Sequence, residues 1–198
     1  MDNLVGIVNY GVAGNIHSVK KAIEKAGGNT LIINTPSDFD KAEKVVIPGV
    51  GSFKSAMQEL TNDGFIEPLI NFNKPVLGIC LGMQIMAKLG FEFGLSSGLG
   101  LVDGEVKPIE CKGKIPHMGF NKIKIVDKND LFHDVEDSDF YFMHSYEMVN
   151  YTDVSALTEF KGHSFVSAIQ KQNLYGVQFH PEKSREAGIK LLSNFIEL

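Results

Sequence analysis

The chain has 198 residues, 43% of them hydrophobic and 22% charged, and its formal net charge is −5. These values predict one globular domain, residues 1–198, with a sizeable core. The negative charge argues against nucleic acid or an anionic membrane as a partner, and no apolar run approaches the roughly 20 residues of a membrane helix.

Two features predict where the protein works. The first eight residues are typical of a strand and lack the basic region of a signal peptide. The two cysteines, Cys80 and Cys111, are too few for a disulfide framework. We therefore expect a cytoplasmic protein.

The first ninety residues alternate between short apolar runs and helical patterns. The runs that predict strands are residues 4–9, 30–33, 45–47 and 75–79, and the helical patterns between them begin near residues 16 and 53. This alternation predicts a parallel sheet with helices on both faces. Such sheets place their sites at the carboxyl ends of the strands.

After Gly90 the pattern changes to short strands punctuated by glycine. Asp103-Gly104 is a hairpin signal. A final helix is predicted from about Ser184. Strands with antiparallel connections are predicted at residues 120–126, 140–143, 154–157, 165–169 and 174–179. We therefore expect a single three-layer α/β domain whose mostly parallel sheet gains antiparallel strands in the C-terminal half.

Cys80 lies between Gly78 and Gly82, at the point where a buried strand passes into a helix predicted over residues 81–89. A sharp strand-to-helix turn needs small residues on both sides of its central residue. Such a turn exposes the thiol at the sheet edge and directs the Leu81 N–H toward an oxyanion beside the sulfur. Taken alone, the segment is equally typical of a buried cysteine in a tight turn.

Two other loops follow strands at the same edge. Gly49-Val50-Gly51 allows a backbone that presents N–H groups inward, although this segment alone favours an ordinary turn with Ser52 as the helix N-cap. The loop from Gly11 to Asn15 lacks the G-x-G-x-x-G spacing of a dinucleotide site. We therefore expect no cofactor.

A histidine and a carboxylate end the last predicted strand. In an extended chain His180 and Glu182 point the same way, and Pro181 between them marks the strand end. A histidine backed by a carboxylate can take a proton from a thiol. Taken singly, His180 is more typical of a structural histidine and Glu182 of a solvated charge near a helix start, but together with the glycine-flanked Cys80 they favour catalysis. No histidine has a partner at metal-ligand spacing, so no metal site is predicted.

The motif G-x-C-x-G at residues 78–82, followed by H-P-E at residues 180–182, resembles the class I glutamine amidotransferase family. The resemblance covers essentially the whole chain and implies that family's flavodoxin-like fold. Further stretches resemble the glutaminase subunits of imidazole glycerol phosphate synthase; they are residues 9–15, 48–51, 78–84, 116–119, 144–146 and 179–184.

The resemblance implies a hydrolase that releases ammonia from L-glutamine. Cys80 would attack the side-chain amide, His180 would move the proton, and Glu182 would orient His180. The oxyanion would be held by the N–H of Leu81 and one from Gly49, Val50 or Gly51. The implied substrate-binding residues are Gln84, Glu92, His144, Ser145 and Tyr146.

The resemblance also implies a partner, the barrel-shaped cyclase subunit of imidazole glycerol phosphate synthase, which would use the ammonia in histidine biosynthesis. The positions matched to the partner side are Asn9, Asn15, Pro116, His117, Met118 and Lys183. Two departures lie on that side: the first loop is one residue longer at Val12-Ala13, and Phe120 replaces the usual tryptophan. An alternative is a paralogue that feeds ammonia to a sugar-amidating enzyme. A non-catalytic scaffold is a third hypothesis, against which the intact Cys80, His180 and Glu182 argue.

Overall fold

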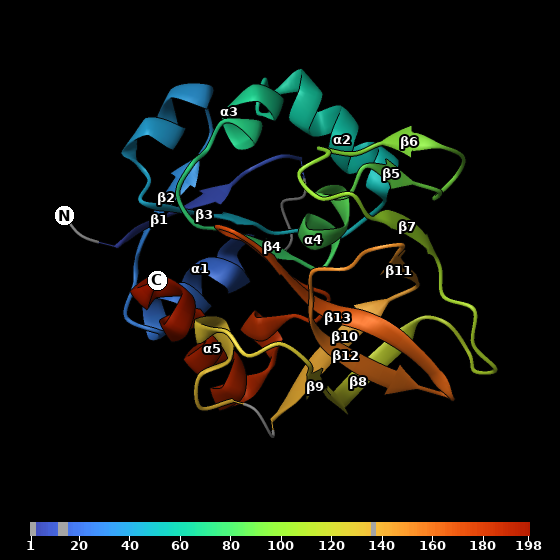
Figure 1. Cartoon of the computed structure of the whole chain (residues 1–198). Coiled ribbons are helices and arrows are strands. Elements are labelled where there is room, and N and C mark those ends of the chain that lie inside the picture. Colours follow the sequence, from blue (N-terminus) through green and yellow to red (C-terminus); the bar gives the residue numbers. More distant parts are fainter. Residues whose placement is uncertain (1–2, 12–15, 136–137) are drawn as a thin grey trace.

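The computed structural model of the chain describes residues 3–11, 16–135 and 138–198. Its described part is built around one large sheet with helices on both sides (Figure 1). The three-layer α/β arrangement expected from the sequence is confirmed.

The central sheet has eight strands in the order β2-β1-β3-β4-β14-β13-β12-β9. Its first five strands are parallel, and the last three join it through antiparallel pairs. The parallel strands are β1 (Leu4–Val8), β2 (Asn29–Ile33), β3 (Lys44–Ile47), β4 (Val76–Ile79) and β14 (Leu174–Val177); the antiparallel ones are β9 (Lys124–Ile125), β12 (Val154–Phe160) and β13 (His163–Lys171). Strands β4 and β14 are therefore neighbours although they are almost a hundred residues apart in the sequence.

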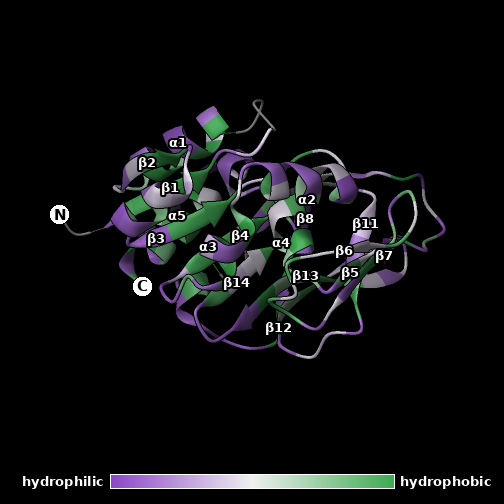
Figure 2. Ribbon diagram, turned by 90° about the horizontal axis from the view of Figure 1, so that it is seen from above, coloured by the Kyte–Doolittle hydropathy of each residue, from purple (hydrophilic) through white to green (hydrophobic). Residues whose placement is uncertain are grey.

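Two hydrophobic clusters fill the spaces on either side of this sheet. Helices α1 (Ile16–Lys25) and α5 (Arg185–Glu197) pack against one face. Helices α2 (Phe53–Asn62), α3 (Ile66–Ile70) and α4 (Leu81–Ile85) pack against the other. The central strands are mostly hydrophobic, whereas the helices carry hydrophilic residues on their outer surfaces (Figure 2). Three short 3-10 helices complete the helical elements: η1 (Pro36–Lys41), η2 (Asp130–Phe132) and η3 (Pro181–Lys183).

Two smaller sheets lie beside the central one. Four strands pair in the order β11-β7-β5-β6, and two more, β10 and β8, form an antiparallel ribbon. Their bounds are β5 (Leu89–Gly90), β6 (Ser96–Ser97), β7 (Glu105–Pro108), β8 (His117–Lys122), β10 (Asp139–His144) and β11 (Tyr146–Val149).

Two sequence-based expectations are wrong. The helix after Cys80 ends at Ile85 instead of Leu89, because the backbone N–H of Leu99 donates to the Ile85 carbonyl and Leu89 pairs in β5. Asp103-Gly104 makes no hairpin, since β7 pairs in parallel with β5 and β6 lies on the other side of β5. In both places contacts between distant segments override the local pattern.

Candidate active site

Cys80 occupies a strained turn between β4 and α4. Its backbone angles are φ 53° and ψ −108°, in a region that residues other than glycine rarely adopt. Its backbone N–H donates to the carbonyl of Val177 at 2.8 Å, which ties the turn to the end of β14. The sharp strand-to-helix turn expected at Cys80 is therefore present, and the thiol lies where β4 and β14 end.

The two glycines beside Cys80 are required by close backbone approach. A Cβ on Gly82 would lie 1.8 Å from the carbonyl oxygen of Ile47, and one on Gly78 would lie 2.6 Å from the backbone nitrogen of Met83. Gly49 packs about as tightly as Gly78, since a Cβ on Gly49 would lie 2.7 Å from the Leu81 Cβ. The Gly49–Gly51 loop and the Cys80 turn are thus pressed together.

His180 and Glu182 form a buried pair at the end of β14. The Nδ1 of His180 and the Oε1 of Glu182 are 2.8 Å apart, and both side chains are 0% exposed. The sequence predicted that the two side chains point the same way because the chain is extended there. That prediction is wrong, because residues 181–183 form the 3-10 helix η3. A tight turn, and not strand alternation, brings the two side chains together.

The environment of His180 favours its charged form. Burial opposes the charge, but the neighbouring Cys80 and Glu182 outweigh burial and raise the pKa of His180 to about 10. Nδ1 is committed to Glu182, and the buried Nε2 has no hydrogen-bond partner among the described residues. Nε2 is therefore the nitrogen available to Cys80.

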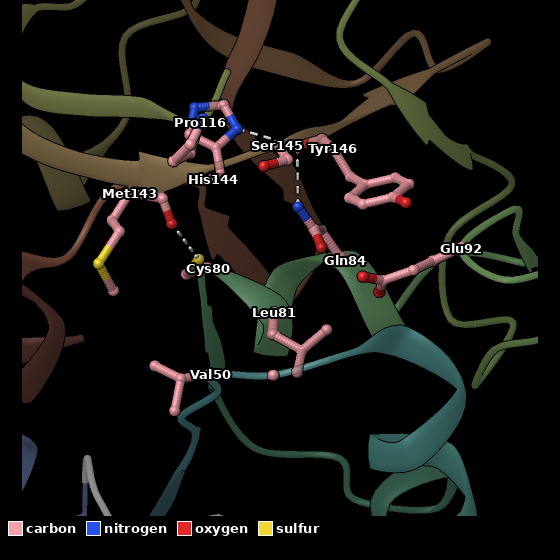
Figure 3. A pocket seen from close by; sticks show the side chains of 11 residues that line it. Val50, Cys80, Leu81, Gln84, Glu92, Pro116, Met143, His144, Ser145 and Tyr146 are labelled. Carbon is pink, nitrogen blue, oxygen red and sulfur yellow. Dashed lines mark hydrogen bonds between the residues drawn. The ribbon is translucent and has the colours of Figure 1, made fainter. Parts of the chain in front are cut away.

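A pocket of about 200 Å³ opens in front of Cys80 (Figure 3). Its volume lies below the roughly 300–1,000 Å³ of drug-sized sites and suits a ligand as small as an amino acid. Nine of the residues implied by the resemblance lie in its wall, with two that were not assigned there; the lining is Val50, Gly51, Cys80, Leu81, Gln84, Glu92, Pro116, Met143, His144, Ser145 and Tyr146. Gly49 is not part of this lining.

The polar side chains of the pocket are held by defined partners. Glu92 Oε2 accepts from the backbone N–H of Phe53 at 2.7 Å. Gln84 Nε2 donates to the Tyr146 carbonyl at 3.0 Å, which Figure 3 draws as a dashed line. That amide group also donates to Gln178 Oε1 at 2.9 Å. Both N–H groups of Gln84 are therefore in use, and Oε1 is its remaining polar atom.

Sequence reasoning missed two residues that contact the sulfur. The Met143 carbonyl lies 3.8 Å from Cys80 Sγ as an acceptor, and Gln178 Nε2 donates to Sγ at 3.6 Å. Gln178 is fully buried just beyond β14, two residues before His180. The feature that could have identified Gln178 from the sequence is a polar glutamine at the end of an otherwise apolar strand.

The placement of His117 on the partner side is wrong, because its side chain is 2% exposed. It stacks between Phe142 and Phe160, and its Nδ1 lies 3.2 Å from His144 Nε2. Burial lowers the pKa of His117 to about 4 and that of His144 to about 3. Both rings are therefore neutral at pH 7, and His144 Nδ1 donates to the Tyr146 carbonyl at 2.9 Å.

The other residues assigned to the partner side lie in varied places. Met118 is 60% exposed on β8 and Lys183 is exposed in η3, whereas Pro116 lines the pocket. Asn9 is half-buried and donates from Nδ2 to Asn34 Oδ1 at 2.7 Å. Asn15 and the Val12-Ala13 insertion lie outside the described residues.

Within residues 3–11, 16–135 and 138–198, no group of three or more histidine, cysteine or acidic side chains could hold a metal ion. The helices of these same ranges are too short or too polar to cross a membrane. Cys80 and Cys111 are both free thiols.

Comparison with known proteins gives a consistent result. Residues 7–198 match the family model described as "Glutamine amidotransferase class-I". The chain is 45% identical to "Imidazole glycerol phosphate synthase subunit HisH 1" of Campylobacter jejuni, with 98% of this chain and all of the relative covered. Identity and coverage are the same for subunit HisH of Chlorobium chlorochromatii. Subunit HisH 2 of Methanococcus maripaludis is 41% identical, with 98% and 99% covered.

Solved structures with low sequence identity share the fold. PurLQS from Thermotoga maritima superposes with a TM-score of 0.78 at 17% identity, covering 100% of this chain and 99% of that one. A glutamine amidotransferase from the same organism gives a TM-score of 0.65 at 18% identity, covering 92% and 77%.

Proposed function

Because this chain belongs to the class I glutamine amidotransferase family, we propose that it is the glutaminase subunit of an imidazole glycerol phosphate synthase. It hydrolyses L-glutamine to glutamate and passes the ammonia to a cyclase subunit in histidine biosynthesis. The observation that carries this proposal is the meeting of Cys80 with the buried His180–Glu182 pair beside a small pocket.

The first step is attack by the Cys80 thiolate on the side-chain amide carbon of glutamine. The thiol proton passes to Nε2 of His180, which Glu182 orients through Nδ1 and stabilises as an imidazolium. The imidazolium then gives this proton to the leaving ammonia, and a thioester remains on Cys80. Water, deprotonated by His180, attacks the thioester and releases glutamate with the thiol restored.

The charge that develops on the amide oxygen needs nearby N–H donors. Leu81 and the Gly49–Gly51 loop supply them, since Leu81, Val50 and Gly51 lie beside Cys80 in the pocket wall. Losing one such donor typically costs about 3 kcal/mol of transition-state stabilisation. The tight packing of Gly49 on Leu81 keeps the two sources of donors together.

The rest of the pocket suits the α-amino acid end of glutamine. Glu92 carries a carboxylate for the ammonium group, and the backbone of residues 144–146 holds the carboxylate. Gln84 can only accept from the substrate, because both of its N–H groups are used by the protein. No cofactor or metal is needed for any of these steps.

A surface next to the pocket is the docking site that we propose for the cyclase. We call it the ribbon patch: the exposed face of β8 and β10 with the end of η3 and the start of α5, comprising Met118, Phe120, Tyr141, Lys183 and Arg185. Phe120 is 41% exposed, its ring packs edge-on against Tyr141, and the Arg185 guanidinium lies 4.4 Å from its centroid. Exposed aromatic and arginine side chains of this kind are enriched in interfaces.

The ribbon patch is continuous with the pocket. Tyr141 and Met143 alternate along β10 and lie opposite Phe120 and Met118 of β8, so the four side chains share one face. Met143 also lines the pocket. A partner docked on the patch would therefore receive ammonia close to where it forms. We place this complex in the cytoplasm, where Cys80 and Cys111 stay reduced.

The test is glutamine-dependent ammonia transfer by the chain co-purified with its cyclase. We expect Cys80→Ser to abolish glutamine use while the cyclase still accepts added ammonia, and the matched Cys111→Ser to remain active. A glutamine-derived chloroketone should label Cys80. If the chain hydrolyses glutamine but neither binds the cyclase nor rescues a histidine auxotroph, its partner is a different amidating enzyme.

A further inference from the structure

A run of hydrogen bonds leads from a backbone carbonyl to the sulfur of Cys80. The Tyr146 carbonyl accepts from Gln84 Nε2 at 3.0 Å, and the same amide group donates to Gln178 Oε1 at 2.9 Å. Gln178 Nε2 then donates to Cys80 Sγ at 3.6 Å. Two side-chain amides thus connect the pocket wall with the nucleophile.

The Tyr146 carbonyl fixes which group donates and which accepts in each of these hydrogen bonds. A carbonyl can only accept, so Gln84 must turn its NH2 group toward Tyr146. The second N–H of that group needs an acceptor, which sets Oε1 of Gln178 toward Gln84. The NH2 group of Gln178 must consequently face the sulfur, and a flipped amide would leave two donors opposed.

The contacts of the sulfur make the orientation of Gln178 matter. Among the described residues, the hydrogen bonds of Sγ are one to the Met143 carbonyl and one from Gln178. A neutral thiol can use both, but a thiolate is only an acceptor and gains nothing from a carbonyl. Gln178 is therefore the side-chain amide that stabilises the ionised sulfur selectively.

Gln178 contacts the sulfur from inside the protein, on the side away from the pocket. Its side chain is 0% exposed and does not line the pocket, so it is not placed to contact substrate. Its backbone N–H donates to Ser167 of β13 at 2.9 Å, which anchors it in the central sheet.

We propose that Gln178 positions the Cys80 sulfur and stabilises it as a thiolate through a donated N–H, with Gln84 holding the Gln178 amide in the donating orientation. This proposal rests on the proposed role of Cys80 as nucleophile. During the reaction the thiol proton goes to His180, and the negative charge left on sulfur is shared with the Gln178 N–H. Gln84 thereby acts on both the substrate and the nucleophile.

Other ionisable groups near Cys80 bear on any measurement of its titration. His180 lies beyond β14, and Tyr10, whose pKa is raised by burial and by Cys80, follows β1. His144 and Glu92 line the same pocket. Each variant below leaves these four groups unchanged, so a difference between variants reports Gln178.

The experiment measures the pH dependence of Cys80 alkylation by iodoacetamide in the full chain, with Cys111→Ser throughout so that one thiol reacts. Gln178→Glu keeps an acceptor for Gln84 but removes the donor to sulfur. Gln178→Met removes both at similar volume. Gln170→Glu is the matched control, because that amide contacts Tyr175 and not Cys80.

We expect the midpoint of alkylation to rise by about one pH unit in Gln178→Met and further in Gln178→Glu, where a carboxylate faces the thiolate. Below the midpoint this is a roughly tenfold slower reaction. Gln170→Glu should leave the midpoint unchanged. Circular dichroism and thermal unfolding identify the variants that fold. Because the two replacements at Gln178 differ in chemistry, a single folded variant is enough to test the proposal.

An unchanged midpoint in a folded Gln178 variant would overturn the proposal and reduce Gln178 to a packing role. The parent chain with its cyclase provides the separate check on the proposed function. If it fails to hydrolyse glutamine, that function is wrong. If it hydrolyses glutamine while the midpoints coincide, only the role of Gln178 is wrong.

Discussion

At the scale of single residues, the candidate site depends on side chains in which each polar atom has a particular partner. His180 uses Nδ1 for Glu182 and keeps Nε2 for Cys80, and the side chains of His180 and Glu182 are shielded from water. The pairing with a carboxylate is what lets a buried imidazole hold a charge. The charge of Glu182 should therefore matter more than its hydrogen bond.

Replacing Glu182 by glutamine tests this. The amide oxygen still accepts from His180 Nδ1, but the lost charge lowers the pKa of His180 and disfavours the imidazolium. We expect kcat for glutamine to fall about 10²-fold with little change in KM, measured in the complex with the cyclase. Glu186→Gln, which alters an 86% exposed carboxylate on α5, should have no effect. Equal loss in both variants would contradict this role for Glu182.

The sequence identified single residues where a motif carried them. Cys80 and His180 stood out through flanking glycines and a strand-ending proline. Gln178 did not, because one amide in an apolar strand has no partner until the sheet brings Gln84 and Cys80 beside it. The burial of His117 was also out of reach, since Phe142 and Phe160 cover it from other strands.

At the scale of elements, the candidate active site is formed by strand ends, and by the loops after them, that pack closely against each other. The turn at Cys80 meets the Gly49–Gly51 loop with no room for a side chain at Gly49, and it meets the end of β3 with no room for one at Gly82. The sequence predicted the parallel strands well because buried parallel strands are apolar throughout, and it predicted the sharp turn at Cys80 from the glycines on both sides. It failed at the end of α4, where the N–H of Leu99 in a distant loop decides where the helix stops.

Gly82→Ala should damage this arrangement strongly. Its Cβ would lie 1.8 Å from the Ile47 carbonyl oxygen, so β3 and the loop after it must move. We expect a loss of about 3 kcal/mol or more in the free energy of unfolding, together with loss of chloroketone labelling at Cys80. Gly162→Ala is the control, since its φ is +77° but nothing lies within 4 Å.

Gly162→Ala should lower the free energy of unfolding by only about 1–2 kcal/mol, through backbone strain, and should leave the labelling of Cys80 intact. Chemical denaturation measures both variants. Similar losses of stability and labelling in the two would show that the contact with Ile47 is not what requires glycine at position 82.

At the scale of the whole molecule, buried neutral histidines tie stability to pH. The folded pKa values of His117 and His144 are lowered by burial to about 4 and about 3, against about 6.5 in an unfolded chain. Between these limits the unfolded chain binds more protons than the folded one. The stability that these two neutral histidines contribute is therefore fully present above about pH 6.5, and it is lost as the pH falls toward 4.

His117→Phe should reduce this acid sensitivity. A phenyl ring keeps the stacking between Phe142 and Phe160 but leaves His144 Nε2 without its donor, which costs about 1–3 kcal/mol at pH 7. The difference in the free energy of unfolding between variant and parent should be about 1–2 kcal/mol smaller at pH 5 than at pH 7, because the variant lacks the His117 imidazole that titrates in the parent. Urea unfolding at both pH values measures it, with the exposed His133→Gln as control; a gap that stays constant would contradict the buried, neutral state of His117.

The place of β14 in the central sheet has a consequence for how the protein is made. This strand is translated after most of the chain, yet it must insert between β4 and β13, both already synthesised. A nascent polypeptide leaving the ribosome therefore carries Cys80 long before His180, its proposed base, has been made, and the partly made sheet exposes two unpaired edges. If His180 is the base that we propose, glutamine hydrolysis becomes possible only in the last tenth of translation, and shorter products should be inert toward glutamine and prone to aggregate.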